Sequence, residues 1–394
     1  MRALTWQGRR DVRVETVPDP RIEKPDDIIV RITSTGICGS DLHLYELFGP
    51  YLDPGDILGH EPMGVVEEVG PQVHALAPGD RVVIPFNISC RDCFMCNQGL
   101  HSQCETTQVE ERETGAAQFG CTKLYGQVPG GQAELLRVPF GNKLPIKVPE
   151  GPPDDRYVYL SDVLPTAWQA VEYAAVPEGG SVAVLGLGPI GDMSTRIALH
   201  RGAGLVIGVD LVDERLERAA GNGVTCFDLR RHGSDLTEAV RDLTDGRGPD
   251  AVIDAVGMEA HGAPFAKAAQ WVTGHLPVAV AQPLMEHAGM DRLGALHTAV
   301  DLVRRGGTLS VSGMYGGAAS PMPLLTMFDK QIQVRMGQAN VWRWVEDILP
   351  LLTDEDPLGV DGFKTHAVPL EDGPKAYAMF QAKEDGMVKT LLKP

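Results

Sequence analysis

The chain has 394 residues, of which 43% are hydrophobic and 22% are charged. This length exceeds what one compact core usually supports and suggests two domains, and the composition is that of a globular protein rather than a disordered, collagen-like or membrane-spanning one. The net charge of -18 at pH 7 argues against nucleic acid or an anionic membrane surface as a partner, because phosphate groups would be repelled over most of the surface.

The amino terminus and the cysteines bear on the compartment. The first residues, MRALTWQGRR, lack the apolar core of a signal peptide, and the longest nearly uncharged stretch, around 271–285, is interrupted by glycine and proline. We therefore expect a cytoplasmic protein with no membrane partner. Because the cytoplasm keeps thiols reduced, the seven cysteines are interpreted first as candidate metal ligands and not as disulfides.

Two patterns of secondary structure follow one another along the chain. From Leu4 to about Lys147, short β-rich runs such as DIIVRITSTG and DRVVIPF are broken by Gly and Pro, which predicts a compact antiparallel β domain. From Ser181, buried strands such as SVAVLGLG and LVIGVD alternate with helical segments such as DERLERAAG, which predicts a parallel sheet covered on both faces. The tail after Gly337 is an amphipathic helix followed by short β segments, and we expect it to rejoin the first domain.

These patterns predict the domain boundaries. We expect a β-rich domain at residues 1–164, a doubly wound domain at 165–337, and a return to the first domain at 338–394. Between two strands of the second domain the chain is longer than one helical crossover needs. The surplus, near 261–292, is either a surface elaboration or a lid or pocket wall beside a ligand-binding edge.

The sequence GLGPIG is a G-x-G-x-x-G that follows a predicted strand and opens a predicted helix. In this context Gly186 allows the tight turn, Gly188 lets the backbone approach a pyrophosphate, and Gly191 lets the helix pack closely on the strand. Pro189 and Ile190 complete the loop. The N-terminus of the helix supplies free N–H groups and a positive dipole to the phosphates, so the loop predicts a dinucleotide site.

The choice of dinucleotide rests on an acid further along the chain. Asp210 ends the next predicted strand, twenty-two residues after Gly188. A carboxylate there can accept both ribose hydroxyls of the adenosine half and would repel a 2′-phosphate, which favours NAD over NADP. The alternative interpretation is a glycine-rich turn followed by an acid through chance.

Four of the seven cysteines fall within the segment CRDCFMCNQGLHSQC, at residues 90–104. Three thiolates spaced by two residues and a fourth after a longer gap can close a tetrahedral zinc site with every ligand supplied by the protein, which makes the site structural. An iron–sulfur cluster is the rival interpretation, but its sequence pattern has a shorter gap and a Cys-Pro pair that this segment lacks. The acidic balance opposes a nucleic-acid-binding zinc ribbon. The candidate ligands are Cys90, Cys93, Cys96 and Cys104.

A second set of candidate ligands is dispersed, with Cys38 in GICGSDLH and His60-Glu61 in GHEPMGVVEEVGPQV. The pattern G-H-E-x-x-G-x(5)-G-x-x-V, from Gly59 to Val73, is similar to the signature of the zinc-containing medium-chain alcohol dehydrogenases. The four-cysteine segment and the dinucleotide loop follow it in that family's order, and the resemblance covers essentially the whole chain. The stretch YLSDVLPTAW looks most like the branch of glutathione-independent formaldehyde dehydrogenases and dismutases.

The resemblance implies an α/β fold in which a Rossmann domain, with its doubly wound parallel sheet, is joined to a β-rich GroES-like catalytic domain. It also implies a catalytic zinc held by Cys38, His60 and Asp162, with Glu61 nearby as a candidate exchanging ligand and a fourth position open. Asp162 departs from the Cys₂His set of alcohol dehydrogenase, although the formaldehyde branch shares it. The alternative is that Asp162 caps the helix starting near Pro165 and that Glu61 is the third ligand.

Carried over to this chain, the resemblance also implies roles for residues around the metal and the cofactor. Ser40 matches the hydroxyl that accepts the substrate's proton, and His43 matches the end of the proton relay, although an ordinary surface histidine is the alternative. Asp41 matches the carboxylate that orients the zinc-bound histidine, although its spacing also fits a turn residue. Thr166 corresponds to the residue packed on the nicotinamide, and Arg215 to the basic residue near the adenosine ribose.

The sequence therefore predicts an enzyme with two zinc ions per subunit that transfers a hydride between a small alcohol or hydrated aldehyde and NAD. A polyol, sugar-alcohol or amino-alcohol dehydrogenase of the same superfamily is the alternative. A catalytically idle binding protein would be expected to have lost Cys38, His60 or Ser40, which this chain keeps. We further expect a homodimer or homotetramer, and a buried strand position for Cys226, whereas the role of Cys121 stays open.

Overall fold

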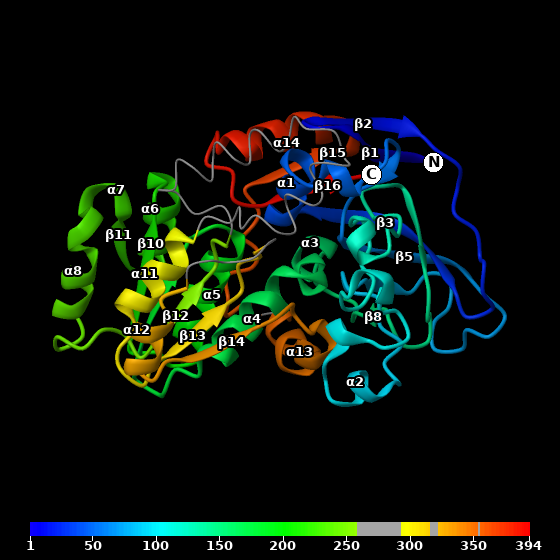
Figure 1. The fold of residues 1–394 in the computed structure, drawn as a ribbon. Helices are drawn as coiled ribbons and strands as arrows, with labels where there is room; N and C mark the ends of the chain where they lie inside the picture. Colours follow the sequence, from blue (N-terminus) through cyan, green and yellow to red (C-terminus); the bar gives the residue numbers. More distant parts are fainter. Residues whose placement is uncertain (258–292, 316–321, 354) are drawn as a thin grey trace. The chain divides into compact units, whose positions relative to one another are not determined.

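The computed structural model describes residues 1–257, 293–315, 322–353 and 355–394. The segment 261–292, for which a lid or a surface elaboration is predicted, lies outside the described residues. The chain forms two compact units (Figure 1). The first comprises Met1–Pro165 and Ala339–Pro394, and the second comprises Thr166–Gln338. Among the described residues, no helix combines the length and the apolar character needed to cross a membrane.

A seven-stranded sheet dominates the first unit, in the order β15-β16-β3-β5-β6-β8, with β7 also paired to β3. Its pairs are antiparallel except for β15 and β16. Residues from several of these strands, such as Ile28, Val30, Val66 and Val82, form one buried apolar cluster. The strands are β3 (Ile28–Ile37), β5 (Glu61–Val69), β6 (Arg81–Val83), β7 (Leu135–Val138), β8 (Ile146–Lys147), β15 (His366–Pro369) and β16 (Thr390–Lys393).

A smaller sheet and short helices complete the first unit. The smaller sheet, in the order β2-β1-β4, contains β1 (Arg2–Gly8), β2 (Asp11–Thr16) and β4 (Asp56–Ile57). The α-helices are α1 (Gly39–Glu46), α2 (Phe94–Asn97), α3 (Asp154–Tyr157), α13 (Val341–Ile348) and α14 (Gly373–Ala382). The 3-10 helices are η1 (Gly49–Tyr51), η2 (His101–Gln103), η3 (Glu110–Arg112), η4 (Lys123–Tyr125), η5 (Val158–Ser161), η7 (Leu349–Leu352) and η8 (Leu370–Asp372).

The C-terminal tail is part of the main sheet of the first unit. β16 lies antiparallel to β3, with Thr390 paired to Ile37. The tail differs from the prediction in one respect, because helix α14 lies between its two strands. A helical connection is long enough to return the chain in the same direction, which is why β15 and β16 are parallel and not a hairpin.

The second unit has the predicted doubly wound parallel sheet, in the order β11-β10-β9-β12-β13-β14. All of its pairs are parallel, and the order reverses between β9 and β12, where such folds bind their ligands. The strands are β9 (Ser181–Leu185), β10 (Leu205–Asp210), β11 (Thr225–Asp228), β12 (Ala251–Asp254), β13 (Thr308–Val311) and β14 (Gln333–Met336). Cys226 lies in β11 as predicted but is only half-buried, because β11 is an edge strand.

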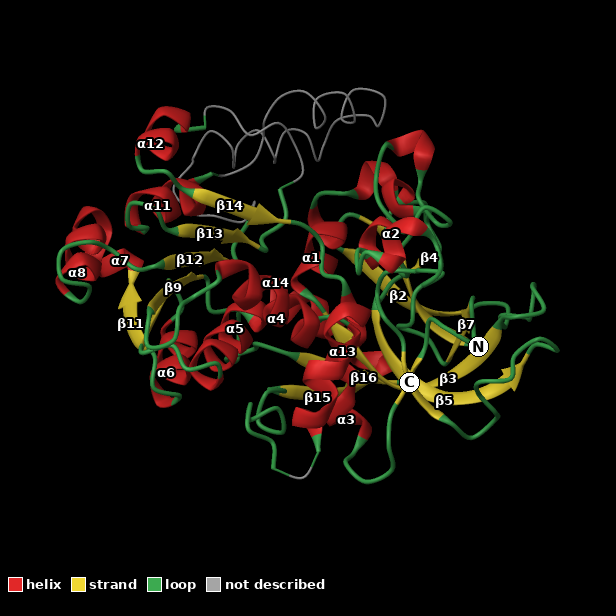
Figure 2. Cartoon of the chain, turned by 90° about the horizontal axis from the view of Figure 1, so that it is seen from below, coloured by secondary structure: helices red, strands yellow, loops and turns green. Residues whose placement is uncertain are grey.

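Helices lie on both sides of this parallel sheet, with α5 and α6 on one side and α11 and α12 on the other (Figure 2). The helices of the second unit are α5 (Pro189–His200), α6 (Asp213–Gly221), α7 (Leu229–His232), α8 (Leu236–Asp242), α11 (Gly294–Leu302), α12 (Leu324–Asp329) and the 3-10 helix η6 (Gly233–Asp235). Helix α4 (Val163–Ala174) begins in the first unit and continues into the second.

Candidate metal and cofactor sites

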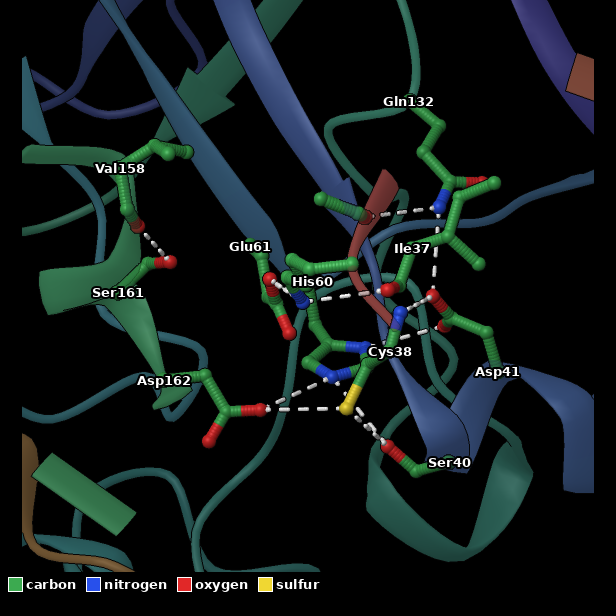
Figure 3. Close-up of polar contacts among 12 residues, drawn as sticks. Ile37, Cys38, Ser40, Asp41, His60, Glu61, Gln132, Val158, Ser161 and Asp162 are labelled. Atoms are coloured by element: carbon green, nitrogen blue, oxygen red, sulfur yellow. Dashed lines mark hydrogen bonds and ion pairs between the residues drawn. The ribbon is translucent and has the colours of Figure 1, made fainter. Parts of the chain in front are cut away.

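Two strands of the first unit bring the dispersed ligand candidates together. Cys38 directly follows β3 and caps α1, and His60 directly precedes β5. Because β3 and β5 are antiparallel neighbours with Gly36 paired to Glu61, the end of one strand lies beside the start of the other. Asp162 comes from a third segment, between η5 and α4, and its carboxylate points toward the cysteine and the histidine (Figure 3).

The ligand atoms lie at distances that suit one zinc ion. Sγ of Cys38 is 3.5 Å and Nε2 of His60 is 3.3 Å from Oδ2 of Asp162, and all three residues are buried. With metal–ligand bonds of about 2.0–2.3 Å, the ligand atoms of a tetrahedral zinc are about 3.3–3.8 Å apart. Zinc accepts thiolate, imidazole and carboxylate donors. The negative charges of the thiolate and the carboxylate together balance the two positive charges of Zn²⁺. The three residues therefore fit a zinc ion whose fourth position remains for a small ligand.

The carboxylate of Asp41 orients the imidazole of His60. Oδ1 of Asp41 lies 3.1 Å from Nδ1 of His60, which leaves Nε2 facing Asp162. The other oxygen of Asp41 accepts hydrogen bonds from the backbone N–H of Cys38 at 3.0 Å and from the side-chain amide of Gln132 at 3.3 Å. Burial alone would lower the pKa of His60, but the carboxylates of Asp41 and Asp162 raise it well above its usual value. Zinc binding would therefore displace a proton from an imidazole that is already oriented.

Ser40 and His43 lie in α1, the helix that begins after Cys38. Oγ of Ser40 is 3.2 Å from Sγ of Cys38 and 3.3 Å from Nε2 of His60, so the hydroxyl borders the ligand set. His43 is buried, and its ring lies edge-on to that of Phe48 with 6.4 Å between their centres. The alternative of an ordinary surface histidine is therefore wrong, because α1 directs this side chain into the interior.

Three buried residues near the ligands were not predicted from the sequence, namely Gln132, Tyr377 and Lys389. The hydroxyl of Tyr377 donates to Oε1 of Gln132 at 2.8 Å, and Gln132 in turn donates to Asp41. Lys389 forms an ion pair with Glu61. Burial raises the pKa of Glu61, and Lys389 acts in the opposite direction. For Lys389, the one signal in the sequence was a lysine directly after the apolar pair Met387-Val388 and close to Leu391-Leu392.

The four-cysteine segment forms a second, separate cluster in the first unit. Sγ atoms of all four lie within 4.8 Å of one another. Backbone N–H groups point at the sulfurs, with Cys90 donating to Cys104 at 3.3 Å and Cys93 donating to Cys90 at 3.4 Å. Burial alone would raise the pKa of Cys90, but hydrogen bonds from Thr106 and from backbone N–H groups lower it to about 7. The cluster suits a zinc ion with all four positions filled by thiolates.

The dinucleotide loop in the second unit has the backbone geometry expected of it. Gly186 has φ +82, where a side chain would be strained. A Cβ on Gly191 would lie 1.7 Å from the carbonyl oxygen of Gly186, so only glycine fits there. Gly188 caps α5, and a Cβ on it would meet nothing closer than the guanidinium of Arg215 at 3.6 Å. The backbone of this turn is thus open for a pyrophosphate at the helix N-terminus, with Pro189 and Ile190 in the first turn.

Asp210 has a bracing role that the sequence did not indicate. Its carboxylate accepts hydrogen bonds from the backbone N–H groups of Leu187 and Leu211, both at 2.6 Å, and of Val212 at 3.0 Å. Nη1 of Arg215, on α6, lies 3.8 Å from Oδ2 of Asp210. The acid at the end of β10 therefore fixes the glycine loop as well as standing beside it. Thr166 lies in α4, in the second unit.

Comparisons with known proteins agree along the whole chain. Residues 24–150 match the alcohol dehydrogenase GroES-like domain, and residues 189–274 match the zinc-binding dehydrogenase family. An uncharacterized zinc-type alcohol dehydrogenase-like protein of Bacillus subtilis is 40% identical over 100% of both chains. The formaldehyde dismutase of Pseudomonas putida is 30% identical over 96% of this chain and 94% of its own. The structure of an alcohol dehydrogenase from Thermus sp. ATN1 has a TM-score of 0.80 and 34% identity, covering 100% of this chain and 99% of that one.

Proposed function

The chain belongs to the zinc-containing medium-chain alcohol dehydrogenases, and we propose that it oxidises a small alcohol or hydrated aldehyde with NAD, at a zinc ion held by Cys38, His60 and Asp162. Family membership confirms the predicted fold class and the predicted class of enzyme. The observation that supports the rest of the proposal is the buried set of thiol, imidazole and carboxylate. Oδ2 of Asp162 lies 3.5 Å from Sγ of Cys38 and 3.3 Å from Nε2 of His60.

The residues around these three ligands would have separate roles in the reaction, in orienting a ligand and in transferring the proton. When bound there, zinc would polarise the substrate oxygen and lower the pKa of an alcohol toward neutrality. Asp41 holds Nε2 of His60 in the ligand direction. The hydroxyl of Ser40, next to both Cys38 and His60, is placed to accept the proton that leaves the substrate. His43, three residues further along α1, would pass that proton onward, a role in which imidazole is the usual side chain.

Two features of the second unit support NAD as the hydride carrier. The open backbone at Gly188 and the N-terminus of α5 suit a pyrophosphate. The carboxylate of Asp210 would repel a 2′-phosphate placed near it, which favours NAD over NADP. When bound, NAD would supply the acceptor for the hydride, while this chain's residues hold and orient it.

Support for the substrate class comes from the relatives. Relatives named as formaldehyde dismutase and as glutathione-independent formaldehyde dehydrogenase are each 30% identical over most of this chain. We therefore propose short primary alcohols and hydrated aldehydes as substrates. A panel of primary alcohols, aldehydes and polyols, followed through the absorbance of NADH, tests this. Turnover of polyols with no turnover of short alcohols would favour the polyol alternative.

An exposed sheet edge supports a homodimer. Within the described part of the chain, β14 pairs with β13 alone, and all four of its residues are exposed. Apolar side chains are exposed on this strand, at Val334 and Met336, and on helix α12, at Leu325 and Phe328. Phe328 is 82% exposed. An unpaired apolar edge can pair with the same edge of a second copy across a twofold axis. Light scattering of the wild type and of Phe328→Glu tests this, and an unchanged monomeric mass in both would contradict it.

We also place the protein in the cytoplasm. All seven cysteines are free thiols, and four of them lie in the cluster that suits zinc. A compartment that keeps thiols reduced would keep these ligands available for the metal. Fractionation of cells that express the protein tests this location, and recovery in an oxidising compartment would contradict it.

A further inference from the structure

A buried ion pair between Lys389 and Glu61 lies beside the proposed metal ligands. Both Lys389 and Glu61 are 0% exposed, and Nζ of Lys389 pairs with Oε2 of Glu61. Lys389 also donates a hydrogen bond to the carbonyl oxygen of Ile37 at 3.1 Å. This carbonyl precedes Cys38 directly. The lysine, just before β16, thus joins the end of β3 to the start of β5.

The backbone around the pair leaves space that only glycine provides. A Cβ on Gly36 would lie 2.0 Å from Oε2 of Glu61 and 3.1 Å from Nζ of Lys389. Gly36 is the residue paired with Glu61 in the sheet. The carboxylate therefore lies against the β3 backbone, on the side from which Lys389 approaches.

The carboxylate of Glu61 is nevertheless close to the metal ligands. One of its oxygens lies within 4.8 Å of the ligand atoms of Cys38, His60 and Asp162. The thiolate and Asp162 already match the charge of Zn²⁺, so Glu61 adds a further buried negative charge. A buried carboxylate without a partner is costly. Glu61 has the ammonium of Lys389 as its partner, and a zinc ion bound by the three ligands would be a second one within reach.

We propose that Lys389 is a positioning residue that holds Glu61 away from the metal and so keeps the fourth position open for substrate. The proposal rests on the proposed assignment of Cys38, His60 and Asp162 as zinc ligands. Without the ammonium, the carboxylate gains most by binding the metal as a fourth protein ligand. The open site then becomes a closed one, similar in saturation to the four-cysteine cluster.

The variant Lys389→Met tests the proposal, because methionine keeps much of the volume and removes the charge. Zinc release from this site to a chelator should slow by about 10- to 100-fold, which is the usual range for changes next to metal ligands. Imidazole serves as a probe of the fourth position in the cobalt-substituted protein, where the visible spectrum reports coordination. Its affinity should fall by at least about tenfold in Lys389→Met.

Two further variants separate positioning from structural support. Lys393→Met removes the lysine at the end of β16, which pairs with Asp155, and should leave zinc release and imidazole affinity at wild-type values. Glu61→Gln/Lys389→Met removes both charges together. It should match Glu61→Gln alone in both measurements, because Lys389 acts through Glu61. This comparison holds even where Lys389→Met does not fold.

Specific results would overturn the proposal. Zinc release from Lys389→Met at the wild-type rate or faster, with unchanged imidazole affinity, would make the ion pair a structural support only. A difference of more than about threefold in zinc release between the double variant and Glu61→Gln would contradict action through Glu61. A wild type that lacks zinc at this site altogether would instead overturn the proposed function, and metal analysis of the wild type distinguishes the two.

Discussion

The first unit contains two candidate metal clusters that are built in opposite ways. The four-cysteine cluster comes from residues 90–104, and its sulfurs accept hydrogen bonds mainly from the backbone of the same segment. The other cluster takes Cys38, His60 and Asp162 from three separate segments and orients them with side chains such as Asp41. A local loop is enough to close a site, whereas a site with a free position needs supports from distant parts of the chain. We interpret the first as structural and the second as catalytic.

The largest expected effect is on turnover, in Cys38→Ser. Loss of the thiolate should remove zinc from the open site and reduce turnover by at least about 10³-fold, because polarisation of the substrate oxygen supplies several kcal/mol. The melting temperature should change by less than about 2 °C, since no core packing is lost. NADH formation and thermal unfolding measure the two quantities. Appreciable hydride transfer by this variant would break the distinction between the clusters.

The matched change in the other cluster, Cys96→Ser, should affect stability first. The binding energy of a structural zinc is also folding energy, so the melting temperature should fall by more than about 5 °C. Turnover at a temperature where the variant is folded should fall much less than in Cys38→Ser. Differential scanning calorimetry of both variants measures this. Equal losses of thermal stability in the pair would show that the two clusters are assigned wrongly.

Replacing each carboxylate by its amide distinguishes whether Asp162 or Glu61 is the third zinc ligand. Asp162→Asn should lose the zinc of the open site, because a neutral amide is a poor zinc ligand, and turnover should fall by at least about 10²-fold. Glu61→Gln should keep two zinc ions per chain. Elemental analysis of the purified variants provides the measurement. The reverse pattern would make Glu61 the third ligand and Asp162 the cap of α4.

A change outside both clusters serves as a control on them. Asp210→Ser should keep both zinc ions and reduce the preference for NAD over NADP by about tenfold or more, because it removes a charge that repels the 2′-phosphate. It also removes the hydrogen bond from Leu187 that braces the glycine loop, and two from Leu211 and Val212 in the turn after β10, so KM for NAD should rise. Steady-state kinetics with both cofactors measure this. A wild type that uses the two cofactors equally would contradict the role of Asp210.

The smallest expected effect concerns the transfer of the substrate's proton from the site of Cys38, His60 and Asp162 to solvent. His43→Ala should lower kcat by about 3- to 10-fold, which is below the roughly 10²- to 10⁴-fold effect of a direct acid–base group, since water can replace the end of a relay. The pH dependence of kcat should change while zinc content stays at the wild-type value. An unchanged pH profile would show that His43 is only a buried packing residue beside Phe48.

The sequence predicted local features better than distant contacts. The run DERLERAAG becomes α6 at the predicted residues, and the predicted strands of the second unit are present, because each pattern lies within a few turns or one strand. Helix α14 was not predicted, since GPKAYAMFQA begins with Gly and Pro and has a weak apolar stripe. The parallel pairing of β15 and β16 depends on that helix and was missed with it.

The same distinction applies to the metal clusters. The spacing of Cys90 to Cys104 contains the whole four-cysteine cluster, so the chain itself indicates it. The ligand role of Asp162 came from a resemblance, because Asp162 lies 102 positions after His60 and no spacing rule joins them. Gln132 and Lys389 were not predicted, because Gln132 reaches the site from a loop and Lys389 from the residue just before the last strand of the sheet. The roles of Cys38, His60 and Asp162 as zinc ligands stay predictions, and the role of Lys389 toward the metal is a proposal from the structure.

Crystals of the wild-type protein, measured at the zinc absorption edge, test the assignment of the two clusters most directly. We predict two anomalous peaks per chain, one among Cys90, Cys93, Cys96 and Cys104, and one bound by Cys38, His60 and Asp162 with Glu61 still paired to Lys389. A single peak in the four-cysteine cluster, or a second zinc bound by Glu61 in place of Asp162, would contradict it.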